Sequence, residues 1–158
     1  MKKNIVITGG AGFVGSNLIK YLLKKTKYNL ISVDNYSTGL RKNHIKSKRV
    51  KYIKSDTQNI NKVLKNPKTI HSLFHFGEFA RIYQSFLKME ECINSNTIGS
   101  NAVVNFCFSN KIKLIYSATS ATMGNKGDDK NLSPYAFTKA KNLELLDNLK
   151  KWFKFKFE

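Results

Sequence analysis

Tyr135 and Lys139 are the residues whose types and spacing point most directly to chemistry. They lie four positions apart in Ser133-Pro134-Tyr135-Ala-Phe-Thr-Lys139, where serine suits a helix N-cap and proline the first helical turn. This spacing predicts that both side chains lie on one helix face. An ammonium group beside a phenol favours the phenolate, so the pair predicts a tyrosine that acts as general base toward a hydroxyl group. On its own, the pair is also compatible with ordinary surface packing.

A glycine-rich stretch, Thr8-Gly-Gly-Ala-Gly-Phe-Val-Gly15, follows a short apolar run near the N-terminus. Glycine is tolerated where a backbone turns tightly or comes close to another group. With a strand before it and a helix after it, this spacing predicts a loop that approaches a pyrophosphate, with helix N-terminal amides as donors. A glycine-rich turn without a ligand is the plainer alternative. The cofactor-binding candidates here are Gly9, Gly12, Phe13, Val14 and Gly15.

Asp34 stands where a dinucleotide-binding fold needs an acidic residue, 19 residues after Gly15. A carboxylate there accepts hydrogen bonds from a ribose diol and repels a 2′-phosphate, so the sequence predicts NAD rather than NADP. A plain turn residue is the alternative for Asp34, and Asn35 beside it joins the cofactor-binding candidates. Asp56, with Thr57 next to it, would meet the adenine edge by its side chain or through neighbouring amides. A helix cap is an equal alternative for Asp56.

The elements that position these residues alternate between strand and helix along the whole chain. The predicted strands are Asn4–Thr8, Asn29–Asp34, Val50–Ser55, Ile70–His75 and Lys113–Ser117. The predicted helices are Gly12–Lys25, Ile60–Leu64, Phe86–Asn110 and Pro134–Phe153. Short apolar strands without strict alternation indicate burial on both faces, as in a parallel sheet. We therefore predict one α/β domain over residues 1–158, a Rossmann-type doubly wound sheet with strand order 3-2-1-4-5.

Composition argues against several other classes of protein. The net charge is +18, but 25 of the 28 basic residues are lysines scattered along the chain. Because nucleic-acid recognition favours arginine, we expect a solvated surface and no specific nucleic-acid partner. No apolar stretch is long enough for a signal peptide or a membrane span.

Cys92 and Cys107 lie on one predicted helix and suit neither a disulfide nor a metal site, which favours a cytoplasmic setting. His44, His71 and His75 show no metal or triad spacing, and we expect them to be structural or exposed.

The motifs together resemble the extended short-chain dehydrogenase/reductases, and within them the NAD-dependent nucleotide-sugar epimerase/dehydratase family. The stretches that carry the resemblance are Thr8–Gly15, Asp34-Asn-Tyr-Ser-Thr-Gly39, Asn96-x-x-Gly99 and Pro134-Tyr-x-x-x-Lys139. The resemblance covers essentially the whole chain. It implies NAD as cofactor and a nucleotide sugar as substrate, and it is compatible with a homodimer.

The resemblance also implies a reaction, the transient oxidation of a sugar carbon as in a 4-epimerase. In the family a Ser or Thr after the fifth strand binds the reacting oxygen, and Ile115–Gly124 resembles that segment. Counting back from Gly124 places this hydroxyl at Thr119, with Ser120 or Ser117 as the other candidates. Tyr135 would take the hydroxyl proton, and Lys139 would keep the phenol acidic while holding the nicotinamide ribose. Dehydratases usually have Asp-Glu after this hydroxyl, and Ser120-Ala121 stands here instead; a dehydratase or dehydrogenase of the same family remains the alternative.

Three further positions match the family pattern in part. Phe76-Gly77-Glu78 resembles the stretch that lines the ribose and nicotinamide side of the cofactor, but Glu78 departs from the usual Ala-Ala pattern. Ser85 and Asn96 match positions near the substrate and the cofactor. For Asn96 the alternative is a side-chain bond to backbone that bends its helix.

The last eight residues, Lys151-Trp-Phe-Lys-Phe-Lys-Phe-Glu158, predict a helix end and the start of a sixth strand. Family members are longer, and their C-terminal portion closes over the substrate, so the resemblance implies an NAD-binding domain without that lid. We expect a fragment of a longer enzyme, a naturally truncated relative, or a cofactor-binding module without turnover. The alternative from another class is a non-catalytic, Lys-rich protein that binds anionic partners.

Overall fold

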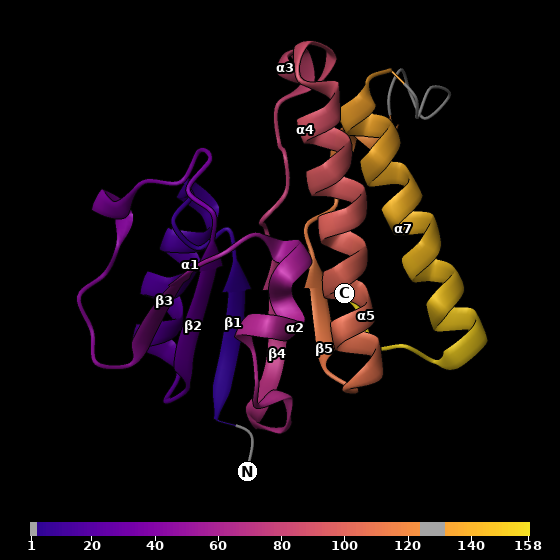
Figure 1. The fold of residues 1–158 in the computed structure, drawn as a ribbon. Coiled ribbons are helices and arrows are strands. Elements are labelled where there is room, and N and C mark those ends of the chain that lie inside the picture. Colours follow the sequence, from indigo (N-terminus) through magenta and orange to yellow (C-terminus); the bar gives the residue numbers. More distant parts are fainter. Residues whose placement is uncertain (1–2, 124–131) are drawn as a thin grey trace.

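A parallel sheet with strand order β3-β2-β1-β4-β5 forms the centre of the molecule, as predicted from the sequence (Figure 1). The computed structural model describes residues 3–123 and 132–158. The strands are β1 (Asn4–Thr8), β2 (Asn29–Asp34), β3 (Val50–Lys54), β4 (Ile70–His75) and β5 (Lys113–Tyr116). In the register of the central strand, Val6 pairs with Ile31 of β2 and with Leu73 of β4. All five carboxyl ends therefore meet at one edge of the sheet.

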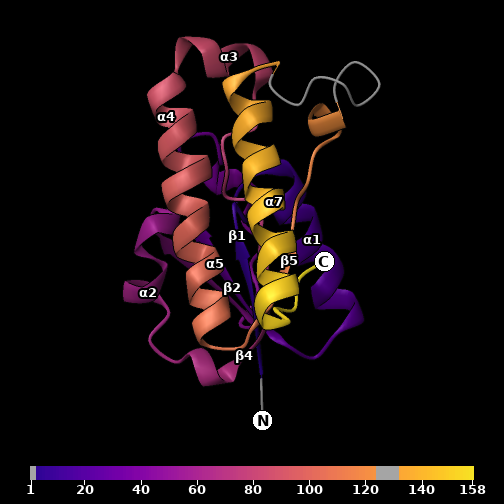
Figure 2. The same ribbon diagram turned by 90° about the vertical axis from the view of Figure 1, so that its right-hand side faces the viewer.

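Helices cover both faces of the sheet and connect its strands, except that β2 and β3 are joined by a loop with a 3-10 turn. They are α1 (Phe13–Lys25), α2 (Ile60–Val63), α3 (Ile82–Leu87), α4 (Met89–Ile93), α5 (Ser100–Ser109) and α7 (Pro134–Phe153). A π-helical segment spans Asn94–Gly99, and short 3-10 turns lie at Arg41–Asn43, Thr57–Asn59, Pro67–Thr69 and Ser120–Met123. Helix α1 lies on one face, α2 and α5 lie on the other, and α7 runs beside α5 near β5 (Figures 1 and 2).

Two apolar clusters, one on each face, hold the helices to the sheet. Val6 belongs to the cluster that also contains Val103 of α5, whereas Ile7 belongs to the cluster that contains Ile19 of α1. Successive strand residues point to opposite faces, and both Val6 and Ile7 are fully buried. The burial of β1 on both faces that the sequence predicts is thus confirmed.

The stretch predicted as one helix at Phe86–Asn110 is interrupted. Lys88 has φ −125° and ψ 48°, outside the helical region, and it separates α3 from α4. The chain then widens into the π-helical segment before α5 begins at Ser100. The helix predicted at Gly12–Lys25 begins one residue later than predicted. Gly12 is its N-cap residue, and α1 begins at Phe13.

The last residues continue the sheet beyond β5. Phe157 forms a parallel bridge with Leu114, and the Leu114 amide donates to the Lys156 carbonyl across 3.1 Å. The predicted start of a sixth strand is therefore confirmed. Across the described residues, 3–123 and 132–158, no helix is long and apolar enough to cross a membrane.

Candidate functional site

The glycine loop joins the carboxyl end of β1 to α1, and close packing explains its glycines. Gly9 has φ +69°, a left-handed conformation that favours glycine. A side chain on Gly15 would bring its Cβ within 2.3 Å of the Gly9 carbonyl oxygen. At Gly12 the one neighbour within 4 Å among the described residues is the same oxygen, at 3.2 Å. The loop therefore folds on itself at Gly15 and is less crowded at Gly12, as a loop that approaches a phosphate should be.

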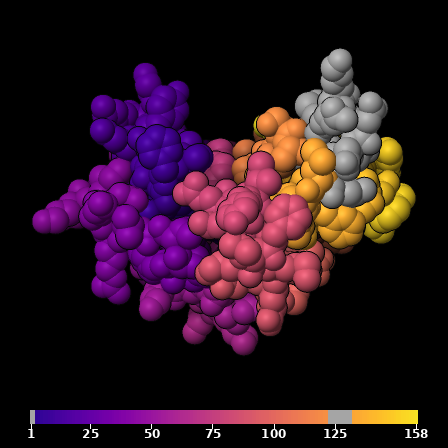
Figure 3. All heavy atoms as spheres, turned by 90° about the horizontal axis from the view of Figure 1, so that it is seen from above, coloured from indigo at the N-terminus to yellow at the C-terminus, as the bar shows by residue number. Residues whose placement is uncertain are grey.

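The two residues at the start of α1 leave the loop accessible. Phe13 is 83% exposed, and Val14 is also exposed. Figure 3 looks from above onto the carboxyl ends of the strands and shows a hollow between the indigo N-terminal segments and the orange segments near α7. Phe13 and Val14 thus lie at a helix N-terminus, as predicted. Their contacts with a cofactor remain a prediction.

Asp34 ends β2 and holds the glycine loop in place. Its Oδ2 accepts from the Ala11 amide at 2.9 Å, and its Oδ1 accepts from the Tyr36 amide at 2.8 Å. Tyr36 has φ +64°, and a Cβ on Gly39 would lie 2.8 Å from Asp34 Oδ1. The turn role considered for Asp34 is therefore present. Its carboxylate lies beside the loop, where the ribose role also requires it.

Asp56 follows β3 at the N-cap position of the turn Thr57–Asn59, and its side chain bonds to a neighbouring loop. Its Oδ1 accepts from Asn35 Nδ2 at 2.6 Å, and it forms no side-chain cap bond with the described residues of the turn that it precedes. Asp56 thus has the cap position but not the side-chain cap bond, because its carboxylate turns toward Asn35. Thr57 packs against two glycines: a Cβ on Gly99 would lie 2.4 Å from Thr57 Oγ1, and one on Gly77 would lie 3.0 Å from Thr57 Cγ2.

Asn96 is fully buried in the π-helical segment and binds another part of the chain. Its Oδ1 accepts from the Phe79 amide at 2.6 Å, and its Nδ2 donates to the Phe79 carbonyl at 3.0 Å. Nδ2 also donates to Thr138 Oγ1 at 3.2 Å. The side chain therefore bonds to backbone, as the alternative for Asn96 supposed, but to the stretch that follows β4 and not to its own helix. Asn96 thus fixes Phe79, two residues after Gly77.

Helix α7 presents the predicted catalytic pair. Ser133 Oγ accepts from the Ala136 amide at 3.0 Å, which confirms the predicted N-cap, and Pro134 occupies the first turn. The Tyr135 amide donates to Ser85 Oγ at 3.3 Å, so α3 supports the start of this helix. Ser85 is fully buried.

Thr119 lies in the segment that follows β5, where the family pattern placed it. Its Oγ1 accepts from the Ala121 amide at 3.2 Å. Ser117, one of the other candidates, donates to the His75 carbonyl at 3.1 Å and joins the ends of β5 and β4, whereas Ser120 is exposed. Gly124, from which the hydroxyl position was counted, lies outside the described residues.

Lys139 makes a contact that the sequence did not predict. Its Nζ forms an ion pair with Glu78 Oε2, and both side chains are only 3% exposed. The ammonium also lies 4.1 Å from the centre of the Tyr116 ring. Burial lowers the pKa of Lys139, and the Glu78 carboxylate opposes this lowering. The sequence predicted Tyr135, one turn away, as the partner of Lys139; the partner that the structure shows is Glu78, in the stretch that follows β4.

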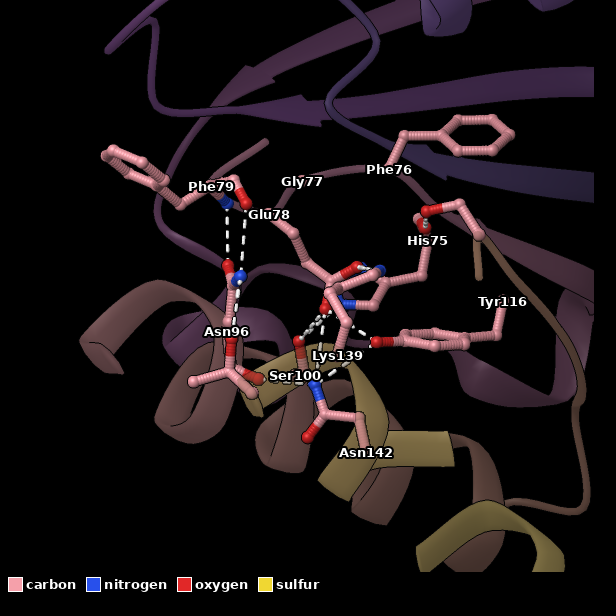
Figure 4. Close-up of polar contacts among 12 residues, drawn as sticks. His75, Phe76, Gly77, Glu78, Phe79, Asn96, Ser100, Tyr116, Lys139 and Asn142 are labelled. Atoms are coloured by element: carbon pink, nitrogen blue, oxygen red, sulfur yellow. Dashed lines mark hydrogen bonds and ion pairs between the residues drawn. The ribbon is translucent and has the colours of Figure 1, made fainter. Parts of the chain in front are cut away.

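The Glu78 carboxylate is the centre of a buried polar cluster (Figure 4). Its Oε1 accepts from Ser100 Oγ at 2.7 Å, from Tyr116 Oη at 3.0 Å and from Asn142 Nδ2 at 3.3 Å. Burial and the Glu78 carboxylate raise the pKa of Tyr116. This cluster was missed because its members are far apart in sequence. One signal in the sequence could have indicated the cluster: Glu78 is a carboxylate at a position where the family pattern has a small residue.

His75 extends the cluster to β1. Thr8 Oγ1 accepts from the Phe76 and Gly77 amides at 3.1 and 3.0 Å, so its own proton points to His75 Nδ1 at 2.7 Å. His75 Nε2 then carries the ring proton and donates to Ser100 Oγ at 2.9 Å. Burial lowers the pKa of His75 to about 4, which agrees with a neutral ring. His75 is therefore structural, as predicted.

The other polar residues considered in the sequence belong to the scaffold. His44 stacks on Tyr52 with ring centres 3.7 Å apart, and His71 lies next to Tyr28. Cys92 and Cys107 are buried free thiols. Within the described ranges no group of His, Cys, Asp and Glu side chains could hold a metal ion.

Comparisons with known proteins agree with this geometry. The model of the NAD dependent epimerase/dehydratase family matches residues 5–157. The chain is 29% identical over 148 residues to the ADP-L-glycero-D-manno-heptose-6-epimerase of Brachyspira hyodysenteriae, which covers 85% of this chain and 45% of that protein.

Two solved structures show the same fold. The UDP-N-acetylglucosamine 4-epimerase of Methanobrevibacter ruminantium, in complex with UDP-N-acetylmuramic acid, has a TM-score of 0.85 and 27% identity over 99% of this chain and 54% of that chain. The UDP-glucose 4-epimerase of Brucella ovis, in complex with NAD, has a TM-score of 0.85 and 20% identity over 98% of this chain and 50% of that chain. The chain thus spans about half the length of these relatives.

Proposed function

The chain belongs to the NAD-dependent epimerase/dehydratase family, and on that premise we propose that it is the cofactor-binding and catalytic part of an NAD-dependent nucleotide-sugar epimerase. One observation carries the proposal. The glycine loop, Asp34 and Glu78 follow β1, β2 and β4 at one edge of the sheet, and Glu78 is paired with Lys139 of the helix that carries Tyr135. In open α/β sheets this edge is where ligands bind.

The loop residues fit a dinucleotide. The packing at Gly15 and the room at Gly12 form a cradle that a Cβ would fill, and the first amides of α1 would hold the pyrophosphate. Asp34 would hold the adenosine ribose, with Asp56 and Thr57 near the adenine. Phe76 and Gly77 would line the other ribose, and Asn96, whose amide is engaged with Phe79, would act by holding them there. NAD, when bound, supplies the hydride acceptor for oxidation of the sugar.

The catalytic residues of this chain would move and hold one proton. Tyr135 takes the proton of the sugar hydroxyl as general base, while the Thr119 hydroxyl binds the same oxygen. Lys139, next to Tyr135 on α7, supplies the positive charge that the family uses to hold the nicotinamide ribose and keep the phenol acidic. Ser120 and Ala121 stand where dehydratases have Asp-Glu, which favours epimerisation over elimination.

The experiment is a calorimetric titration of the chain with NAD⁺, followed by an assay with UDP-glucose or UDP-galactose. We expect NAD⁺ binding with little turnover, because orientation of the substrate provides much of the rate and the chain spans only about half the length of its relatives. Tyr135→Phe is the control and should bind NAD⁺ like the unmodified chain. Failure to bind NAD⁺ would contradict the proposal, and robust turnover that Tyr135→Phe abolishes would show that this half suffices.

A further inference from the structure

The Glu78–Lys139 pair has defined charges. Glu78 Oε1 receives hydrogen bonds from a hydroxyl, a phenol and an amide, and Oε2 receives the Lys139 ammonium. A side chain that only accepts is an ionised carboxylate. Because a buried carboxylate is stable only when it is paired, its partner Lys139 is the charged ammonium.

The carboxylate is held from three elements, so its position is fixed. Ser100 belongs to α5, Tyr116 to β5 and Asn142 to α7. Asn142 Nδ2 also donates to the Asn96 carbonyl at 2.5 Å. Figure 4 shows these side chains converging on the end of Glu78. Glu78 in turn fixes Lys139, whose ammonium lies between this carboxylate and the Tyr116 ring.

The same cluster reaches the backbone on the cofactor side. Ser100 donates to Glu78 and accepts from His75, and the other nitrogen of His75 accepts from Thr8. Thr8 accepts from the Phe76 and Gly77 amides. A directed series of hydrogen bonds thus links the Lys139 ammonium to the backbone that follows β4.

We propose that Glu78 is a positioning residue of this site: its carboxylate holds the Lys139 ammonium in one place relative to the Phe76–Glu78 stretch. The family pattern has a small residue at the position of Glu78. Because Glu78 binds Lys139 directly, the position of the Lys139 ammonium does not depend on a bound ligand. The expected effect of Glu78 on NAD⁺ binding rests on the proposed function. Its effect on the position and reactivity of the Lys139 ammonium does not.

The first experiment measures amine reactivity in the cofactor-free chain. A lysine-acylating reagent is applied over a range of pH, and modification at each lysine is followed by mass spectrometry. We expect Lys139 to react at least about tenfold more slowly than the exposed Lys141. In Glu78→Gln the carboxylate that raises the pKa of Lys139 is lost, so a larger fraction of Lys139 is the free amine at a given pH. Lys139 should therefore react faster in this variant than in the unmodified chain at the same pH.

Two variants complete this experiment. Glu91→Gln is the matched control, because it removes the carboxylate of an exposed pair with Lys88 and should leave Lys139 unchanged. Glu78→Asp keeps the charge and should retain most of the protection, and it replaces Glu78→Gln if that variant does not fold. Fast labelling of Lys139 in the unmodified chain, or equal labelling before and after Glu78→Gln, would overturn the proposal.

The second experiment measures NAD⁺ binding. Lys139→Met and Glu78→Gln should weaken it by similar factors, about tenfold, and the double variant should be no weaker than either single variant, because residues that act through one contact are not additive. Factors that multiply in the double variant would overturn the proposal. If the unmodified chain does not bind NAD⁺, the proposed function fails while the labelling result still decides the role of Glu78.

Discussion

His75 Nε2 and Ser100 Oγ lie 2.9 Å apart in the buried contact between β4 and α5. With Nδ1 engaged by Thr8, the folded protein keeps His75 neutral, and burial lowers its pKa to about 4. An unfolded histidine binds its proton near pH 6.5. Between these values the unfolded state binds a proton that the native state does not. We therefore expect the free energy of unfolding to fall by up to about 3 kcal/mol as pH decreases from about 6.5 to 4.

Urea denaturation at a series of pH values tests this expectation. His75→Gln, which cannot titrate, should be less stable at neutral pH and should lose most of this pH dependence. Parallel pH profiles of the two proteins would assign the dependence to other groups.

Two loop glycines should respond differently to alanine. In Gly15→Ala the new Cβ meets the Gly9 carbonyl oxygen and Gly10 Cα, at 2.3 and 2.7 Å, so we expect a loss of about 3 kcal/mol in unfolding free energy. Gly12→Ala should cost only about 1 kcal/mol, mainly through a poorer helix N-cap, and should weaken NAD⁺ binding by filling the cradle. Thermal unfolding and NAD⁺ titration of both variants provide the measurement; equal losses of stability would show that the loop does not pack as described.

The two cysteines should be unreactive in the folded protein. Both are fully buried, and burial raises the pKa of Cys107 to about 12 and also raises that of Cys92. Because the thiolate is the reactive form, we expect negligible reaction with a disulfide reagent at pH 8 and complete reaction of both thiols in urea. Rapid modification of either thiol in the native protein would be inconsistent with this packing.

Asp34 should determine the choice between NAD⁺ and NADP⁺. Its carboxylate repels a 2′-phosphate, so NAD⁺ should bind more tightly, and Asp34→Asn should narrow the difference. The same variant should loosen the loop, since an amide cannot accept from both Ala11 and Tyr36 through two oxygens. Calorimetry with each dinucleotide checks the preference, and Asp147→Asn, an exposed change on α7, is the control. Equal affinities in the unmodified chain would refute this assignment.

Most element limits were predictable because they depend on local pattern, and the strand order followed from the fold class that the alternation of strands and helices indicates. The apolar runs ending at Thr8, Asp34 and His75 gave correct strand ends, and Ser133-Pro134 gave the correct helix start. These signals lie within a few residues of the features that they predict.

The contacts of the site were less predictable because they join distant residues. Glu78 and Lys139 are separated by 61 positions, and nothing local indicates that they meet. The break at Lys88 in the predicted Phe86–Asn110 helix was also not predicted, because the apolar pattern continues across that residue.

The order of the strands has a consequence for how the chain folds during synthesis. Of the five strands, β1 is made first and is central; β2 and then β3 are added on one side, and β4, β5 and the Phe157 bridge are added in turn on the other. A chain that emerges from the ribosome N-terminus first therefore never has to insert a strand between two that are already paired. Each new strand docks on an open edge, so the sheet can grow outward in step with translation.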